Sequence, residues 1–202
     1  MTWRGLLRTV DPQLSERNPM NPGIELALER NRAFAASSGH EGASVFPALR
    51  LLVVTCLDPR VDPAHVLGVD LSDAMVVRNV GGLVTQEVIN DVAFAGQLAE
   101  RMVSQGPLFE VAVIHHTDCK AAALSDDTFR SAYADSIGVD ESELRDRAIV
   151  DPSSTVARDV ERLRSAPQVS PRIPVSGYVY DLHTGLVHSV VPAEDEATRR
   201  AA

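Results

Sequence analysis

The chain has 202 residues, of which 45% are apolar and 23% charged, a composition ordinary for a globular domain with a full core. Its formal net charge of −9 repels phosphate backbones, and aromatic residues at 4% offer little for stacking bases, which argues against nucleic acid as a partner. No apolar run approaches the roughly 20 residues of a membrane-spanning helix, and the N-terminus lacks the uninterrupted apolar segment of a secretory signal, so we expect a cytoplasmic protein without a membrane partner.

Residues 1–40 are predicted to form an N-terminal helical arm. Asn21 is a favoured N-cap residue, Pro22 suits the first helical position, and the apolar residues that follow form a modest stripe. An arm of this kind needs a surface to lie on, provided either by its own domain or by a partner subunit. At the other end of the chain, residues 193–202 are polar, and we expect a disordered tail there.

The stretch between them, residues 41–192, is predicted to be one α/β domain. Short, Val-rich and nearly continuous apolar segments are typical of strands covered on both faces. Three such segments occur, at residues 49–56, 74–79 and 110–116. The last segment of the domain, residues 173–191, is predicted to be an antiparallel hairpin with Thr184 and Gly185 at its turn.

Helical patterns alternate with these strands. The helical segments are predicted at residues 83–103, 126–138 and 153–165, with Thr85 a suitable cap for the first. Strands that alternate with helices imply a mainly parallel β-sheet with right-handed crossovers. The predicted fold class is therefore α/β: a mainly parallel sheet flanked by helices, with a closing antiparallel hairpin as its edge.

Reactive side chains gather where three of the predicted strands end. CLDPR follows the first strand, RNVGG the second and HHTDCK the third, at residues 56–60, 78–82 and 115–120. Ligands of open α/β sheets bind at the carboxyl ends of the strands. We therefore expect these three loops to carry the chemistry.

The two cysteines of the chain, Cys56 and Cys119, lie in two of these loops. Together with His116 they offer two sulfurs and one imidazole nitrogen, a set that suits zinc in tetrahedral geometry and leaves a fourth position for water or a carboxylate. Asp58 is close enough in sequence to be that fourth ligand or to accept a hydrogen bond from a water on the metal. Arg60 is placed to hold the Asp58 carboxylate bidentately and keep it ionised.

Taken in order, C-x-D-x-R after one strand, R-N-x-G-G after the next and H-x-x-C after a later one resemble the β-class carbonic anhydrases. The resemblance covers roughly Leu51 to Val190 and includes the closing GYVYDLHTGL. HHTDC and the DDTF that follows resemble a compact bacterial subgroup of the family. Where the family usually has glycine after the second cysteine, this chain has Lys120.

The resemblance implies a zinc lyase, a carbonic anhydrase in which Cys56, His116 and Cys119 hold Zn²⁺ and Asp58 with Arg60 forms the catalytic dyad. The implied reaction is the reversible hydration of carbon dioxide to bicarbonate and a proton by attack of zinc-bound hydroxide. The motif is compatible with an open site, in which water is the fourth zinc ligand, and with a closed site, in which Asp58 takes that position. The resemblance further implies a homodimer, often paired into a homotetramer, whose N-terminal helices embrace the neighbouring subunit.

Two other functions stay open at this point. A hydrolase of carbonyl sulfide or carbon disulfide would use the same zinc set, because close relatives of the family catalyse those reactions. A non-catalytic zinc or redox-sensing module would use Cys56 and Cys119 as a switchable pair. In that second case Asp58 and Arg60 would have no evident task.

Four polar neighbours of these residues are assigned mainly to structure. We interpret His115 as a structural residue in preference to a proton carrier. Arg78 and Asn79 are as suited to bracing their loop as to contacting substrate, and Asp118 is interpreted as a turn residue.

Overall fold

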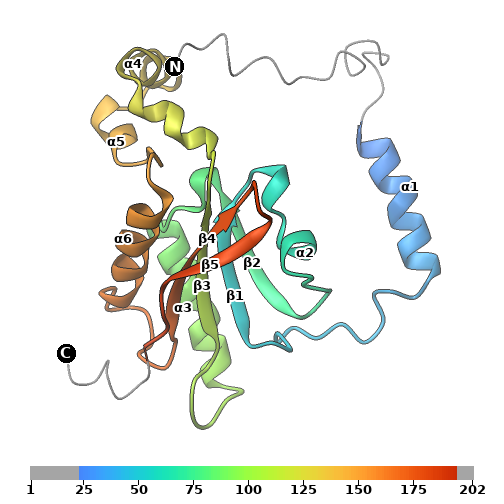
Figure 1. The fold of residues 1–202 in the computed structure, drawn as a ribbon. Helices are drawn as coiled ribbons and strands as arrows, with labels where there is room; N and C mark the ends of the chain where they lie inside the picture. Colours follow the sequence, from blue (N-terminus) through green and yellow to red (C-terminus); the bar gives the residue numbers. More distant parts are fainter. Residues whose placement is uncertain (1–22, 195–202) are drawn as a thin grey trace. The chain divides into compact units, whose positions relative to one another are not determined.

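The computed structural model describes residues 23–194 of the chain (Figure 1). The predicted cap residues Asn21 and Pro22 lie outside the described residues, as does the predicted tail from residue 195 onward.

The chain divides into two units, one ending at Ala43 and one beginning at Ser44. The first unit contains helix α1, Gly23–Ala36, which lies within the predicted helical arm. None of its residues is buried, and its apolar side chains, among them Ile24 and Phe34, are exposed. The predicted domain limits at residues 40 and 192 stay predictions.

The second unit is built on a five-stranded sheet in the order β2-β1-β3-β4-β5. Its strands are β1 Leu51–Cys56, β2 Ala74–Asn79, β3 Glu110–His116, β4 Val175–Asp181 and β5 Leu186–Val191. The first four run parallel, and β5 pairs antiparallel with β4. The predicted α/β fold with a closing hairpin is therefore confirmed. Gly185 allows the hairpin turn because its φ of 72° lies in the left-handed region.

The three longer helices of this unit are capped by side chains that the sequence supplies. Thr85 accepts the Val88 N–H and starts α3, Gln86–Glu100. Two aspartates play the same part for α4, Asp127–Ile137, and α6, Pro152–Arg164. The short helices α2, Pro63–Val66, and α5, Glu141–Arg145, were not predicted. Among residues 23–194, no helix is long and apolar enough to cross a membrane.

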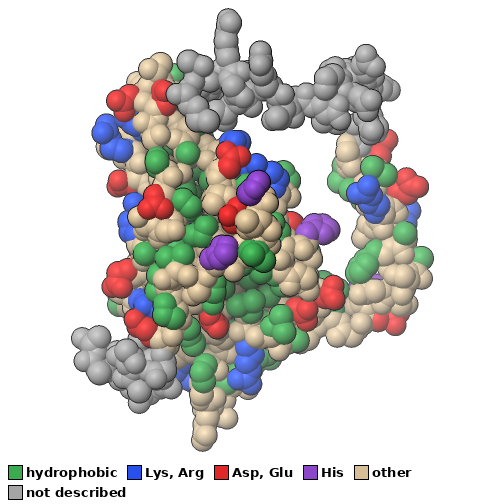
Figure 2. All heavy atoms as spheres, viewed as in Figure 1, with side chains coloured by type: hydrophobic (Ala, Val, Ile, Leu, Met, Phe, Trp, Pro, Cys, Tyr) green, Lys and Arg blue, Asp and Glu red, His purple; other side chains and the backbone are tan. Residues whose placement is uncertain are grey.

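Helices α3 and α6 pack against the same face of the sheet and form the main core (Figure 1). The opposite face carries Val53, Ala112 and Ile114, packed against side chains that include Leu67 and Tyr178. Figure 2 shows hydrophobic side chains gathered over the middle of the sheet, with charged ones around them. Strands β1 and β3 are thus buried on both faces, as predicted.

For β2 the same prediction is wrong. This strand lies at the edge of the described sheet, most of its residues are only partly buried, and Val76 is 43% exposed. Its apolar sequence alone does not distinguish a central strand from an edge strand, because that depends on which strands pair with it.

Candidate metal centre

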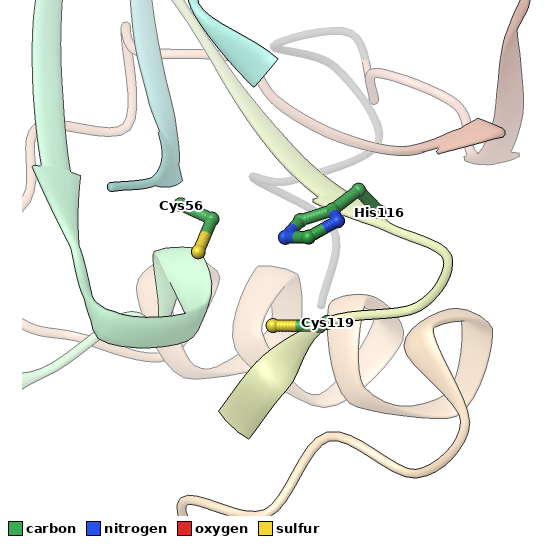
Figure 3. A group of neighbouring side chains, drawn as sticks. All are labelled: Cys56, His116 and Cys119. Atoms are coloured by element: carbon green, nitrogen blue, oxygen red, sulfur yellow. The ribbon is translucent and has the colours of Figure 1, made fainter. Parts of the chain in front are cut away.

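Cys56, His116 and Cys119 meet at the carboxyl ends of two neighbouring strands. Cys56 is the last residue of β1 and His116 the last of β3, while Cys119 follows in the loop after β3. One donor atom from each lies within 4.8 Å of the others, and all three residues are buried. Figure 3 shows the three side chains pointing toward a common space. We call these three residues the ligand group.

The His116 ring is oriented with one nitrogen free for a metal. Its Nδ1 lies 2.9 Å from the Thr117 carbonyl oxygen, which can only accept, so Nδ1 carries the proton. Among the described residues, Nε2 is buried and has no hydrogen-bond partner. A buried nitrogen lone pair beside two thiols is the arrangement of a metal ligand whose other nitrogen is held by a backbone carbonyl.

The two thiols share one proton unequally. A hydrogen bond from the Cys119 thiol lowers the pKa of Cys56 to about 4, helped by the neighbouring His116 and opposed by burial. The same bond, together with burial, raises the pKa of Cys119 above its usual range. A divalent cation between the sulfurs would replace that shared proton, so the residues fit a soft metal such as zinc.

Asp58 is held by Arg60 and is not part of the ligand group. Its Oδ1 accepts from Arg60 Nε at 2.9 Å and its Oδ2 from Nη2 at 2.6 Å, a bidentate pair. Hydrogen bonding to Arg60 lowers the pKa of Asp58 to about 2, and the same pair raises the pKa of Arg60 further. The Asp58 N–H donates to Cys56 Sγ at 3.4 Å, which ties the dyad to the ligand group.

Arg78 braces the loop after β1 through its backbone. It donates to the carbonyl oxygens of Cys56 and Asp58 at 3.0 and 2.7 Å and pairs with Asp62 at 2.5 Å. Its three nitrogens are thereby engaged in structure. Of the two interpretations offered for Arg78, bracing is the one that these contacts favour.

The Gly81–Gly82 turn brings one loop directly against another. Asn79 closes the turn by exchanging two hydrogen bonds of 2.8 Å with the Leu83 backbone. Gly82 has a φ of 68°, and a Cβ there would lie 2.7 Å from the Cys56 backbone nitrogen. Only glycine fits this close approach.

His115 points into the protein on the other side of β3, because successive side chains of a strand alternate. It is fully buried, and its Nε2 lies 3.2 Å from the Gly82 carbonyl oxygen and 3.3 Å from Asp159 Oδ2. Both partners are acceptors, so Nε2 carries a proton. The contacts agree with the structural interpretation of His115. Asp159, which also accepts the Val84 N–H, was not found from the sequence, since it lies on a distant helix.

Asp118 and Lys120 form an exposed set of charges with Arg60 that we call the ionic rim. Asp118 Oδ2 accepts from Arg60 Nη1 at 3.0 Å, and its Oδ1 accepts from Lys120 Nζ at 2.9 Å. These pairings lower the pKa of Asp118. The sequence interpretation of Asp118 as a turn residue holds for its backbone, whose φ is 53°, but misses its contact with the dyad.

A cavity of about 360 Å³ opens beside the ligand group. Its walls are mainly apolar, with Phe129 and Tyr133 stacked 6.0 Å apart on one side. The residues that line it are Cys56, Leu57, Asp58, Pro59, Val80, Gly81, Cys119, Lys120, Ala121, Leu124, Phe129 and Tyr133. The ionised Asp58 carboxylate, the two cysteines, Lys120 and Tyr133 are therefore the polar residues of a small, mainly apolar chamber.

A mainly parallel α/β sheet that brings a Cys₂His group and an arginine-held carboxylate to adjoining strand ends defines a metal-dependent α/β enzyme. A family model described as carbonic anhydrase matches residues 51–187. Beta-carbonic anhydrase 1 of Mycobacterium tuberculosis is 29% identical over 157 residues, 77% of this chain and 91% of that protein. The chain belongs to the β-class carbonic anhydrase family.

Two further similarities show the breadth of this group. The crystal structure of carbonic anhydrase from Streptococcus mutans is similar with a TM-score of 0.69 and 30% identity, covering 84% of this chain and 98% of that one. A carbon disulfide hydrolase of Acidithiobacillus thiooxidans is 28% identical over 156 residues, 67% of this chain and 74% of that protein.

Proposed function

We propose that this protein catalyses the reversible hydration of carbon dioxide to bicarbonate and a proton. The observation that carries the proposal is the convergence of Cys56, His116 and Cys119 beside an Asp58 carboxylate that Arg60 keeps ionised. The three residues of the ligand group would hold zinc. A zinc ion bound there would lower the pKa of a coordinated water to about 7 and supply a nucleophile at neutral pH.

Asp58 would orient the nucleophile. With its pKa lowered to about 2, the carboxylate accepts a hydrogen bond at neutral pH but does not keep a proton. Arg60 fixes the plane of the carboxylate by its bidentate contact, so the direction of the accepted bond is set before substrate arrives. The proton released by the reaction must therefore pass on to water or buffer.

The apolar chamber suits a small apolar substrate. Leu57, Val80 and Leu124 line it, and they offer no hydrogen bonds that would hold water in the place of carbon dioxide. Substrate carbon can thus approach the ligand group from the apolar side, while Asp58 stands at the polar side.

The proposal is tested by assaying purified, metal-replete protein for carbon dioxide hydration in a stopped-flow instrument, with zinc content measured in parallel. We expect about one zinc per chain, as one three-residue ligand group can hold one ion, and a rate well above buffer. Removal of the metal with a chelator should abolish the rate, and added zinc should restore it. A metal-replete protein no faster than buffer would rule the reaction out.

A second candidate, hydrolysis of carbonyl sulfide or carbon disulfide, is favoured by the relative named as a carbon disulfide hydrolase. It is also favoured by the apolar lining of the cavity, which offers space for sulfur atoms. Release of hydrogen sulfide from either compound measures this activity directly. The two candidates are separated by comparing kcat/KM for carbon dioxide with that for the sulfur compounds on one protein preparation.

Both cysteines are free and buried. A reducing compartment preserves such thiols for a metal, so we infer a cytoplasmic location. The alternative of a redox-sensing module predicts metal-free protein that forms a reversible Cys56–Cys119 disulfide on oxidation. Thiol counting and metal analysis on the same preparation decide between that alternative and a zinc enzyme.

We also infer a homodimer or homotetramer in which the arm of residues 1–40 lies on a neighbouring subunit. The support is the apolar stripe of α1, where Ile24, Leu28 and Phe34 are 61%, 47% and 43% exposed. Light scattering after size-exclusion chromatography should give a dimer or larger assembly for the full chain. Replacing Leu28 and Phe34 with glutamate should reduce the molar mass of the assembly. An unchanged molar mass would show that the arm is not part of the interface.

A further inference from the structure

The guanidinium of Arg60 is held on two edges by two different aspartates. Asp58 takes the edge formed by Nε and Nη2, at 2.9 and 2.6 Å. Asp118 takes the other edge, with its Oδ2 at 3.0 Å from Nη1 and its backbone carbonyl oxygen at 3.2 Å from Nη2. All three nitrogens of Arg60 are therefore engaged, and the plane of the group is fixed by both aspartates together.

The second aspartate belongs to the loop that carries two of the metal ligands. Asp118 lies between His116 and Cys119, and its φ of 53° places it in the left-handed region, which aspartate tolerates better than most residues. Because the ligand group flanks it on both sides, its backbone is placed together with theirs. The Arg60–Asp118 contact thus links the loop after β1 to the loop after β3.

Lys120 limits what Asp118 can offer to Arg60. It is the only lysine among the 202 residues, and its Nζ lies 2.9 Å from Asp118 Oδ1, the carboxylate oxygen that Arg60 does not use. With Lys120 in place, Asp118 gives Arg60 one side-chain oxygen. Without it, both oxygens would be free to bind Arg60 and would compete with Asp58 for Nη2.

These charges contribute little to stability by themselves. The side chains of Arg60, Asp118 and Lys120 are 41%, 61% and 54% exposed, and ion pairs this open to water are weak. Asp58 in contrast is only 10% exposed. The consequence of the pairs is therefore one of orientation, because they decide how Arg60 faces a largely buried carboxylate.

We propose that Asp118 is a positioning residue for the Asp58–Arg60 dyad, and that Lys120 acts on the site through Asp118. The proposal deepens the proposed function and rests on it for its meaning in catalysis. Its geometry concerns residues of this chain alone, so it is testable on the metal site even where carbon dioxide is not the substrate.

The first experiment is a double-mutant cycle with Asp118→Asn, Lys120→Met and the double variant, assayed as zinc-loaded full-length protein. Asp118→Asn should lower kcat/KM by roughly 3- to 10-fold, the size of coupling found within one hydrogen-bonded network. Lys120→Met should lower it by a smaller factor. In the Asp118→Asn background, Lys120→Met should have no further effect on kcat/KM. With Asp118 intact, Lys120→Arg in place of Lys120→Met should restore the wild-type kcat/KM.

Two matched controls remove a like charge outside the site. Asp70→Asn changes an exposed aspartate before β2, at the opposite end of the strands, and Arg101→Met removes a cation at the end of α3. Both should leave kcat/KM unchanged. If Lys120→Met keeps its full effect in the Asp118→Asn background, Lys120 does not act through Asp118 and the proposal is overturned.

The second experiment does not need the reaction. Protein loaded with Co²⁺ has a visible absorption spectrum that changes when a carboxylate joins the metal ligands. Asp118→Asn should shift the spectrum relative to the wild type, because Asp58 is then less firmly held by Arg60. When Asp58 is already replaced, the shift should vanish: Asp58→Asn/Asp118→Asn should have the spectrum of Asp58→Asn. A spectrum identical to that of the wild type, at equal cobalt content, would overturn the positioning role. A shift in a protein without carbon dioxide hydration would sustain the role and refute only the proposed reaction.

Discussion

The ligand group (Cys56, His116 and Cys119), which forms the floor of the candidate site, and the ionic rim (Arg60, Asp118 and Lys120) differ in solvent exposure. The ligand group at the floor is at most 5% exposed, whereas the side chains of the ionic rim are between 41% and 61% exposed. At the floor, burial leaves each donor atom with few alternatives, so the geometry is set by the sheet. At the rim, each charge can exchange its partner for water, so the same kind of contact adjusts orientation and contributes little to stability.

The largest test of this contrast is to remove a ligand from the floor. Cys56→Ser should retain far less than one zinc per chain and hydrate carbon dioxide at the buffer rate, because a hydroxyl is a poor replacement for a thiolate. Metal analysis and stopped-flow assays measure both. Thr55→Ser is the matched control, since serine keeps the hydroxyl that donates to the Ile114 carbonyl oxygen. Full zinc and activity in Cys56→Ser would exclude Cys56 as a ligand.

A smaller but still large effect is expected between floor and rim, at Asp58. Asp58→Asn should keep its zinc and lose roughly 10²-fold in kcat, because the amide replaces one accepting oxygen with a donor. Equal zinc content in the two proteins is the control for folding. A loss of zinc together with activity would instead make Asp58 part of the metal-binding floor.

The backbone behind the floor should be intolerant of even one methyl group. Gly82→Ala is expected to destabilise the protein by about 1–3 kcal/mol, because alanine is strained in the left-handed region and its Cβ would meet the Cys56 backbone nitrogen. Urea unfolding gives the free energy of unfolding. Gly138 ends helix α4 with its φ in the left-handed region and has open space around it. Gly138→Ala therefore adds the backbone strain without a steric contact, and it should lower the free energy of unfolding by less.

The pKa of Asp58 predicts a pH dependence of stability. Because its folded-state pKa is lowered from 3.8 to about 2, ionised Asp58 stabilises the fold above pH 3.8, and this is lost as the pH falls toward 2. The contribution is at most about 2 kcal/mol, since Arg60 is partly solvated. Unfolding of metal-free wild type and Asp58→Asn between these pH values measures it. Parallel curves for the two proteins would contradict the assignment.

The smallest effect is expected at the rim and should depend on salt. The factor by which Asp118→Asn lowers kcat/KM should shrink toward about 1–2 at roughly 1 M NaCl, where the Debye length falls to about 3 Å. The factor for Asp58→Asn should change much less, because Asp58 is largely buried. Equal salt dependence of the two factors would erase the distinction between rim and floor.

Much of the fold follows from local patterns. The apolar runs that became β1 and β3, the cap Thr85 and the turn at Gly185 each predict an element that the structure contains. The patterns did not show that β2 is an edge strand, because exposure depends on strand order. They also missed α2 and α5, which are too short to show a helical period.

The two adjacent histidines show where the prediction of the site stops. His115 and His116 are the same residue type in the same strand, and both are buried. Only their side-chain direction separates them: His116 faces the sulfurs, whereas His115 faces Asp159 and Gly82. Alternation in a strand predicts that the two side chains face opposite sides of the sheet. It does not predict which residues they contact there, because those residues come from distant segments.

By itself, the sequence determined the donor types and their order: two thiols, an imidazole, a carboxylate and a guanidinium at the ends of predicted strands. It could do so because residue chemistry and short-range spacing are local properties. Only the tertiary structure decided that Asp118 would share Arg60 with Asp58 and that Lys120 would hold the remaining oxygen. Arg60 and Asp118 are joined by the parallel pairing of β1 with β3, and no local pattern encodes which oxygen a side chain reaches across that distance.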